Sequence, residues 1–380
     1  MDLAERIERR RRSTEESGPV ASWQALSPTA HLDEPVDRGE VVDRLLDALS
    51  PVFDGHLPEP FTVTGPPGSG KSAVVTAVMA ELDDQLGSPV GTVYTTTRAA
   101  SATGVRFVYV DARYAPSRFQ LYRSLLSSLT DEHVPERGIG TDALGERLGR
   151  ELAAPDRRAL LALDHVGEPR TPSSAAVERA LDPIPGLSWF SIGREGSGNG
   201  GESLSVPGYA RHALVDVLGV RATRGLTRGL DPAAVERLAA WADGNAHDGL
   251  CALTCAAIAA EEAGSVRVTE EHLEAGRRAV PEECIPFGQV LSLPKNRQRV
   301  LRALLSEAAT DLTIEEAADR IGENTELSAG TVKRFLYELA EYGVLDRVRT
   351  VGSGESGRTP SRVEPRFSVP AFYRLVDDAD

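Results

Sequence analysis

Hydrophobic and polar positions alternate in blocks that predict strands and helices in turn along the first half of the chain. Short apolar or alternating runs predict strands at residues 61–64, 105–111, 159–164, 187–192 and 203–206. Longer runs with helical spacing predict helices at residues 41–52, 73–86, 118–130 and 142–153. The alternation predicts an α/β fold, in which helices cover both faces of a parallel sheet.

The second half of the chain has a helical pattern and then a different arrangement. Residues 210–280 are predicted to be helical, with turns at 229–232 and 244–245. Further helices are predicted at 295–309, 313–321 and 328–342, followed by strands at 345–351 and 363–369 joined by a tip rich in Gly, Ser and Arg. Three helices closed by a hairpin describe a winged helix. We therefore expect a flexible tail (1–30), an α/β domain (31–208), a helical domain (209–281), a linker (282–294) and a winged helix (295–380).

A glycine-rich segment lies between the first predicted strand and the helix that follows it. Its glycines let successive backbone N–H groups point at a phosphate, the lysine adds a positive charge, and the final serine hydroxyl can hold Mg²⁺. The alternative is a simple Gly/Pro turn, but the strand and helix on either side favour a P-loop that binds ATP or ADP with Mg²⁺. The segment consists of Gly65, Pro66, Pro67, Gly68, Ser69, Gly70, Lys71 and Ser72.

Asp164 ends the apolar run at 159–164 and is the second candidate at this site. Ligands of open parallel sheets bind beyond the carboxyl ends of the strands, so Asp164 is expected beside the P-loop, where it and Ser72 would position Mg²⁺. The alternative is a cap of the next helix, and both roles are compatible. His165 follows it, either as a weak catalytic base or as a tolerated replacement; we favour the replacement.

The composition of the chain is acidic and contains little lysine. The net charge is −15, the isoelectric point is about 5.1, and lysine occurs only at positions 71, 295 and 333. An acidic surface nearly without lysine suits a solvent of high salt, although a GC-rich genome would produce the same bias. Residues 295–380 hold 13 basic and 15 acidic side chains, so this part is nearly neutral.

Cysteine content and hydropathy give no sign of a disulfide framework or a membrane segment. Cys251, Cys255 and Cys284 are expected to be small core residues in a reducing compartment, because no histidine or cysteine pair completes a recognisable metal motif. No apolar run approaches the length of a membrane span, so a cytoplasmic protein without membrane partners is expected.

The predicted winged helix carries candidates for duplex DNA. Ser328 can cap its third helix, whose N-terminal half would enter a major groove, and arginines of the hairpin would contact phosphates. A protein-binding winged helix is the alternative, since Glu338, Glu341 and Asp346 lie nearby. The DNA-binding candidates are Thr331, Lys333, Arg334, Tyr337, Arg347, Arg349, Arg358 and Arg362.

These motifs, in this order, resemble the archaeal replication initiators related to the origin recognition complex and Cdc-type loaders, which are AAA+ ATPases with a C-terminal winged helix. The resemblance covers about residues 31–375, through DEPVDR (33–38), GPPGSGKS, VYVDARYAPSRFQLYRSLLSSL, VPGY (206–209) and GNAH (244–247). It implies nucleotide contacts by Val36, Arg38, Tyr209 and His247. It also implies duplex DNA at an origin-like or regulatory site as a partner, with a replicative helicase or related initiator subunits as further partners.

Several positions depart from the family pattern. Asp164-His165 stands where the family has Asp-Glu, Ser191 or Arg194 would have to replace a polar sensor, and His247 stands at the sensing arginine of the lid. A histidine near its ordinary pKa is mostly neutral and cannot replace guanidinium. We therefore expect a divergent paralogue that binds nucleotide and DNA with weak or absent hydrolysis. The alternatives are an active ATPase that loads a helicase, and a regulatory ATPase whose winged helix binds protein.

Overall fold

The computed structural model describes residues 18–32, 34–86, 104–153, 157–194, 201–307, 309–349 and 360–377. It divides into two compact units. One runs from His31 to Ala213, and the other combines the N-terminal segment up to Ala30 with Leu214 onward. Within the described ranges, no helix is both long enough and apolar enough to cross a lipid bilayer.

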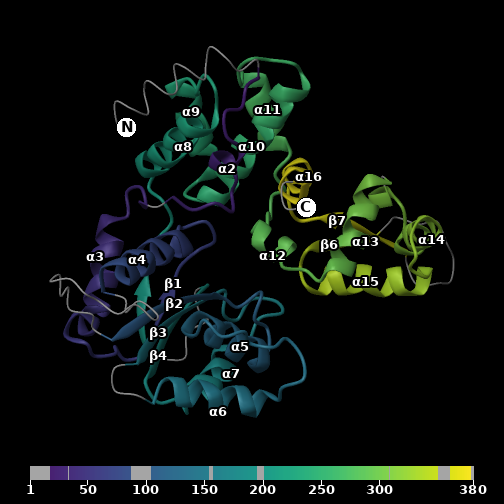
Figure 1. Cartoon of the computed structure of the whole chain (residues 1–380). Helices are drawn as coiled ribbons and strands as arrows, with labels where there is room; N and C mark the ends of the chain where they lie inside the picture. Colours follow the sequence, from purple (N-terminus) through teal and green to yellow (C-terminus); the bar gives the residue numbers. More distant parts are fainter. Residues whose placement is uncertain are drawn as a thin grey trace. The chain divides into compact units, whose positions relative to one another are not determined.

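The unit from His31 to Ala213 is built on a sheet whose strands β1 to β4 are labelled in Figure 1. The sheet is parallel and has five strands in the order β2-β3-β4-β1-β5. The strands are β1 (Phe61–Thr64), β2 (Val105–Asp111), β3 (Arg158–Asp164), β4 (Leu187–Gly193) and β5 (Glu202–Ser205). The helices are α3 (Gly39–Ala48), the 3-10 helix η1 (Ser50–Asp54), α4 (Lys71–Leu86), α5 (Arg118–Leu129), α6 (Thr141–Glu151) and α7 (Ser174–Leu181).

Strand β3 shows how the sheet is buried on both faces. Leu160 and Ala162 pack into the apolar cluster formed with α3 and α4, whereas Leu161 and Leu163 pack into the cluster formed with α5, α6 and α7. Successive side chains of a strand point to opposite faces, so a strand covered on both sides must be apolar at every position. The α/β fold expected from the sequence is confirmed.

The second unit is mostly helical. Its N-terminal segment holds α2 (Trp23–Leu26), and α8 (Arg211–Gly225) begins at the boundary between the units. The remaining elements are α9 (Pro232–Ala242), α10 (Ala246–Glu262), α11 (Glu270–Arg278), α12 (Phe287–Leu291), α13 (Lys295–Ser306), η2 (Ala309–Asp311), α14 (Ile314–Asn324), α15 (Ala329–Glu341), β6 (Leu345–Arg349), β7 (Ser361–Pro365) and α16 (Val369–Asp377).

Part of the predicted flexible tail is folded. Helix α2 is capped by the Ser22 hydroxyl, and Leu26 is fully buried. Thr254 on α10 donates a hydrogen bond to the Leu26 carbonyl (2.8 Å), and Arg221 on α8 donates one to the Ala30 carbonyl (2.8 Å). The prediction is therefore wrong for residues 18–30, because long-range partners order a segment too short to show a pattern of its own. Residues 1–17 lie outside the described part.

The C-terminal elements follow the predicted order with one correction. Strands β6 and β7 pair antiparallel after α13, α14 and α15, as expected for a winged helix. Strand β7 ends at Pro365, and the segment predicted to continue it instead leads into α16. Phe367 and Phe372, whose rings lie 5.3 Å apart, are both buried there. The apolar pattern of this segment is therefore compatible with the start of a helix as well as with the end of a strand.

Candidate functional site

The P-loop connects β1 to α4, as the sequence predicts. Gly68 and Gly70 have φ angles of 67° and 80°, in the left-handed region that favours glycine. A Cβ atom on Gly70 would lie 2.4 Å from the Tyr209 hydroxyl oxygen, so glycine is also required by space. The Lys71 ammonium donates to the carbonyls of Gly65 (2.9 Å) and Pro66 (2.7 Å), which keeps its charge at the mouth of the loop.

Arg38 and Tyr209 brace this loop. The Arg38 guanidinium donates from Nη2 to the carbonyls of Ser69 (2.7 Å) and Pro207 (3.0 Å). It also lies over the Tyr209 ring, 3.6 Å from the ring centre. Arg38 is only 6% exposed, so these contacts are shielded from water. Both residues were expected to contact nucleotide, and the structure places both against the P-loop. Val36 is half-buried nearby in sequence, and its nucleotide contact stays a prediction.

Asp164 lies at the same sheet edge as the P-loop. It ends β3 and aligns with Ile192 of β4, while the last residue of β1, Thr64, aligns with Gly193. The carboxylate is buried; it accepts hydrogen bonds from the Tyr109 hydroxyl (2.7 Å) and from the backbone N–H of His165 (2.7 Å). Burial and the Asp164 charge raise the pKa of Tyr109, so the phenol stays protonated and donating.

His165 lies between two carboxylates. Its φ angle is 62°, its Nδ1 lies 3.0 Å from Glu168 Oε1, and its Nε2 lies 3.6 Å from Asp164 Oδ2. Burial alone would lower the pKa of His165, but the Asp164 charge and the Glu168 hydrogen bond outweigh it and raise the pKa above its usual value. Two acidic groups that face the ring favour its protonated form, which argues against the weak base that was one of the two expectations for His165.

Glu168, Arg113 and Asp111 complete this cluster, and the sequence analysis missed all three as site residues. Burial would raise the pKa of Glu168, but the hydrogen bond and charge of His165 lower it, with help from Arg113 and Arg194. Arg113 is paired with Asp111 at the end of β2 (2.6 Å). Asp111 could have been found by the rule that identified Asp164, since it too ends a strand at this edge. Glu168 carries no such signal.

Of the two proposed sensor replacements, only one is near the cluster. Ser191 is buried within β4 and donates to the Thr62 hydroxyl of β1 (3.2 Å), so its side chain serves the sheet interior. Arg194 follows β4, and its charge helps to lower the pKa of Glu168, which places it by the acidic edge. The glycine-rich residues 195–200 lie outside the described part of the chain.

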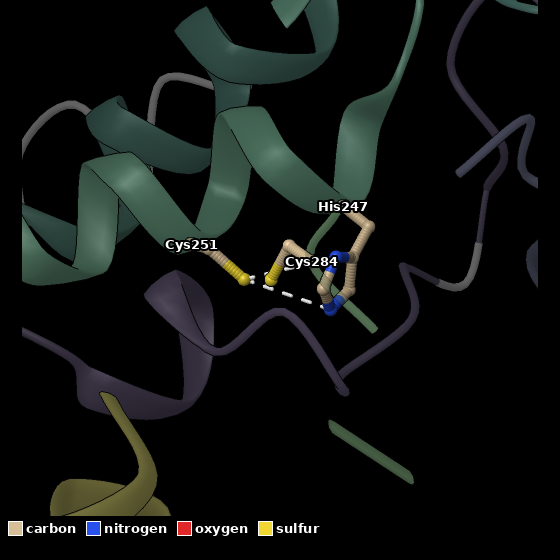
Figure 2. Close-up of side chains that lie close together, drawn as sticks. All are labelled: His247, Cys251 and Cys284. Carbon is tan, nitrogen blue, oxygen red and sulfur yellow. Dashed lines mark hydrogen bonds between the residues drawn. The ribbon is translucent and has the colours of Figure 1, made fainter. Parts of the chain in front are cut away.

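His247 has partners inside its own unit. It belongs to α10, its side chain is 11% exposed, and its ring centre lies 5.9 Å from that of Phe287. Figure 2 shows the ring facing the sulfur atoms of Cys251 and Cys284. The sequence analysis found no histidine that completes a metal motif with the cysteines, and the structure brings His247 to two of them. Its sequence signal was the spacing of four between His247 and Cys251, which places both on one helix face. The nucleotide contact of His247 stays a prediction.

The candidate DNA-binding residues lie on α15 and the hairpin. Lys333 pairs with Glu315 (3.0 Å), and Arg334 lies 3.7 Å from Glu338. Arg347 lies over the Tyr337 ring, 5.3 Å from its centre, so β6 and the third helix of the winged helix meet there. Thr331 is half-buried in the first turn of α15, Arg349 is exposed on β6, and Arg362 pairs with Glu364 on β7. Arg358 lies outside the described residues.

A family model matches part of this chain, and known proteins are similar to it over most of its length. Residues 34–185 match the family model of the AAA ATPase domain. The ORC1-type DNA replication protein 8 of Halobacterium salinarum is 26% identical, over 90% of this chain and 92% of its own. The ORC1-type DNA replication protein 1 of Sulfurisphaera tokodaii is 24% identical, over 88% of this chain and 87% of its own.

Solved structures show the same fold. The Aeropyrum pernix ORC1 protein, solved in complex with DNA, has a TM-score of 0.63 at 23% identity and covers 96% of this chain and 98% of its own. Cdc6p from Pyrobaculum aerophilum has a TM-score of 0.56 at 16% identity and covers 95% of this chain and 100% of its own. The chain therefore contains an AAA ATPase domain, is similar over nearly its whole length to ORC1-type DNA replication proteins, and has the fold of the ORC1 and Cdc6p structures.

Proposed function

We propose that this protein is a nucleotide-dependent DNA-binding protein of the replication-initiator type. It binds ATP or ADP with Mg²⁺ at the P-loop and duplex DNA through the winged helix, and it hydrolyses ATP weakly or not at all. The observation that carries the proposal is the braced P-loop: Arg38 and Tyr209 hold a glycine-dependent turn at the N-terminus of α4, with Lys71 at its mouth.

The nucleotide assignment follows from this geometry. Backbone N–H groups at a helix N-terminus attract phosphate, and Lys71 adds a full positive charge. Ser72 and Asp164 supply the oxygen ligands that Mg²⁺ prefers. A protein of similar fold, the Aeropyrum pernix ORC2 protein, has been solved as complexes with ADPNP and ADP. Nucleotide at the P-loop is the corresponding proposal for this chain.

Weak hydrolysis is proposed from the groups around Asp164. Phosphoryl transfer needs an oriented water and positive charge near the γ-phosphate. The residue after Asp164 is a histidine that faces two carboxylates, and its raised pKa favours the protonated form, which makes it a poor acceptor for a proton from water. Glu168 is the nearest alternative base, but its Oε1 is engaged with His165. The protein would therefore act through nucleotide occupancy.

An active ATPase is the second candidate, and a specific observation favours it. Glu168 Oε2 is buried and accepts no hydrogen bond from the described residues, so this carboxylate retains one unused oxygen. If the His165 contact opened, Glu168 could orient water. Replacing Glu168 by Gln would then abolish hydrolysis. If the protein acts through nucleotide occupancy alone, the same replacement should leave an already negligible hydrolysis rate unchanged.

DNA binding is proposed for the face where α15 and β6 meet. Lys333 and Arg334 lie on the N-terminal half of α15, the end that enters a major groove in helix-turn-helix proteins. Each has a carboxylate partner on the surface, and such exposed pairs are weak enough to exchange for phosphate. The acidic partners are also the observation that keeps a protein-binding winged helix as an alternative.

The experiment is a pair of titrations on the full chain. Lys71→Ala should weaken ADP binding, measured by calorimetry, by at least about tenfold, because a charge-assisted contact is lost. Lys295→Ala is the matched control and should leave the affinity unchanged. Equal affinities of Lys71→Ala and the unchanged protein would contradict the nucleotide site.

For DNA, fluorescence anisotropy with a labelled duplex compares Lys333→Ala/Arg334→Ala with the control Arg237→Ala/Arg278→Ala. The control pair also removes two exposed arginines that contact glutamates, but outside the winged helix. The first variant should bind at least about tenfold more weakly, and its salt slope should be shallower by about 2, because about one counterion is released per phosphate contact. Equal binding by both variants would remove the winged helix from DNA recognition.

A further inference from the structure

Three potential metal ligands meet in the unit that contains α10. His247 and Cys251 are four residues apart on α10, so both side chains lie on one face of the helix. Cys284 approaches from the connection between α11 and α12 (Figure 2). One nitrogen or sulfur atom from each of the three residues lies within 4.8 Å of the others. Two segments separated in sequence therefore bring one imidazole and two thiols together.

The spacing of these atoms suits a tetrahedral ion. Zinc binds sulfur at about 2.3 Å and imidazole nitrogen at about 2.0 Å, which places two such ligands about 3.5 Å apart at a tetrahedral angle. His247 Nε2 lies 3.6 Å from Cys251 Sγ. Three converging ligands leave a fourth position, which water fills in zinc sites with three protein ligands.

A neighbouring carboxylate orients the imidazole. Asp248 Oδ1 lies 3.2 Å from His247 Nδ1. Metal-binding histidines commonly donate their second ring N–H to such a carboxylate, which fixes the tautomer and raises the basicity of the other nitrogen. Nδ1–H donating to Asp248 leaves the lone pair of Nε2 for a cation, and Nε2 is the ring nitrogen closer to Cys251 Sγ.

The surrounding side chains shield two of the three ligands, Cys251 and His247, from solvent. Cys251 is fully buried, Phe287 lies against the His247 ring, and the His247 side chain is 11% exposed. Cys255, one turn further along α10, is different: its sulfur lies 2.9 Å from the Ser368 hydroxyl oxygen.

We propose that His247, Cys251 and Cys284 form a binding site for a thiophilic divalent cation, zinc. Binding would release the two thiol protons and form two metal–thiolate bonds and one metal–imidazole bond. The ion would link the connection between α11 and α12, which continues toward the winged helix, to α10. It would also engage His247 Nε2, so this residue could not serve as the nucleotide sensor that the family resemblance implies. The proposal is independent of nucleotide and DNA binding.

The test uses the full chain, purified with a thiol reductant and without chelator. After addition of Zn²⁺ and removal of excess by gel filtration, elemental analysis should give one zinc per chain. Co²⁺ in its place should give the intense visible bands of a tetrahedral ion and the near-ultraviolet thiolate-to-metal absorption. Cys251→Ser, Cys284→Ser and His247→Ala should each reduce affinity by at least about tenfold, the scale of loss already seen on removing an outer-shell partner.

Cys255→Ser is the matched control, since it replaces a buried cysteine of the same helix outside the cluster, and it should retain full stoichiometry. Cys284 is only partly buried, so Cys284→Ser keeps the test valid if Cys251→Ser fails to fold. The wild-type stoichiometry and cobalt spectrum need no variant. Absence of bound metal, equal binding by Cys284→Ser and wild type, or a Cys251–Cys284 disulfide found by mass spectrometry under the same conditions would each overturn the proposal.

Discussion

Replacement of Arg38 tests how the P-loop is held in place. The guanidinium makes two hydrogen bonds to backbone carbonyls, those of Ser69 and Pro207, and it stacks on Tyr209. Hydrogen bonds that involve a charged group contribute about 1.5–3 kcal/mol each, and a desolvated cation–π contact contributes about 2 kcal/mol. Arg38→Met keeps the volume and removes all three contacts, so the free energy of unfolding should fall by about 4 kcal/mol after partial relaxation.

Arg38→Lys should cost less. Lysine keeps a charged donor that can serve both carbonyls, as Nη2 does, but it lacks the planar guanidinium that stacks on Tyr209. We expect a loss of about 2 kcal/mol in the free energy of unfolding. The affinity for ADP should fall by about tenfold in both variants, because the Ser69 carbonyl and the P-loop backbone around it are no longer held. Arg44, which donates from an exposed position to the Ser205 carbonyl (2.8 Å), is the matched control. Arg44→Lys should change stability by less than about 0.5 kcal/mol.

The assay follows the P-loop unit alone. The chain has three tryptophans, at positions 23, 189 and 241. In a Trp23→Phe/Trp241→Phe background, the remaining Trp189 lies buried on β4 and reports urea unfolding of the sheet by fluorescence. If Arg38→Lys and Arg44→Lys had the same small effect on unfolding and on ADP affinity, the brace would have no energetic role and the argument would be refuted.

Further predictions concern the cluster around Asp164. With Mg²⁺ and ATP, the wild-type protein should complete less than about one turnover per minute, far below the usual 1–100 per second of kinases. Multiple turnovers per minute that are lost in both Lys71→Ala and Glu168→Gln would instead establish the active ATPase. His165→Asn, which tolerates the left-handed backbone, should lower the melting temperature most near about pH 5.5. The reason is that the raised pKa of His165 contributes its full stabilisation at pH values below the ordinary pKa of histidine. This contribution is lost as the pH rises through the raised pKa. The lowered pKa of Glu168 gives stability that is lost as the pH falls below its usual value. A pH-independent loss in scanning calorimetry would contradict the charged pair.

The sheet and P-loop could be predicted because their residues carry local signals. The run 159–164 is apolar at every position because both faces of β3 are buried, and its terminal acid marks the functional edge. The fold of residues 18–30 could not be predicted, because Leu26 and Ala30 are held by Thr254 and Arg221 from distant helices. Tertiary partners decide such short segments, whatever their own sequence prefers.

The charges at the site show the same limit. Asp164 and His165 are neighbours in the sequence, but the pKa of His165 also depends on Glu168. The turn after β3 brings Glu168 to the imidazole ring. Cys284 likewise reaches His247 and Cys251 from a different segment, so a search for a compact metal motif could not find the group. The strand predicted at 363–369 was too long. Phe367 is buried just before the start of α16, and a buried apolar residue at this position fits the end of a strand as well as the approach to a helix.

The most direct test of nucleotide-dependent DNA binding is one equilibrium titration. Fluorescence anisotropy of a labelled duplex is measured with the full chain without nucleotide, with Mg²⁺ and ADP, and with Mg²⁺ and a non-hydrolysable ATP analogue, for wild type and Lys71→Ala. A nucleotide can shift DNA affinity only through its different affinity for the DNA-bound and free protein, and typical couplings are about 5- to 150-fold. We expect wild-type affinity to change by at least about fivefold with nucleotide and that of Lys71→Ala to stay constant. Identical wild-type curves in all three conditions, with nucleotide bound, would contradict the account.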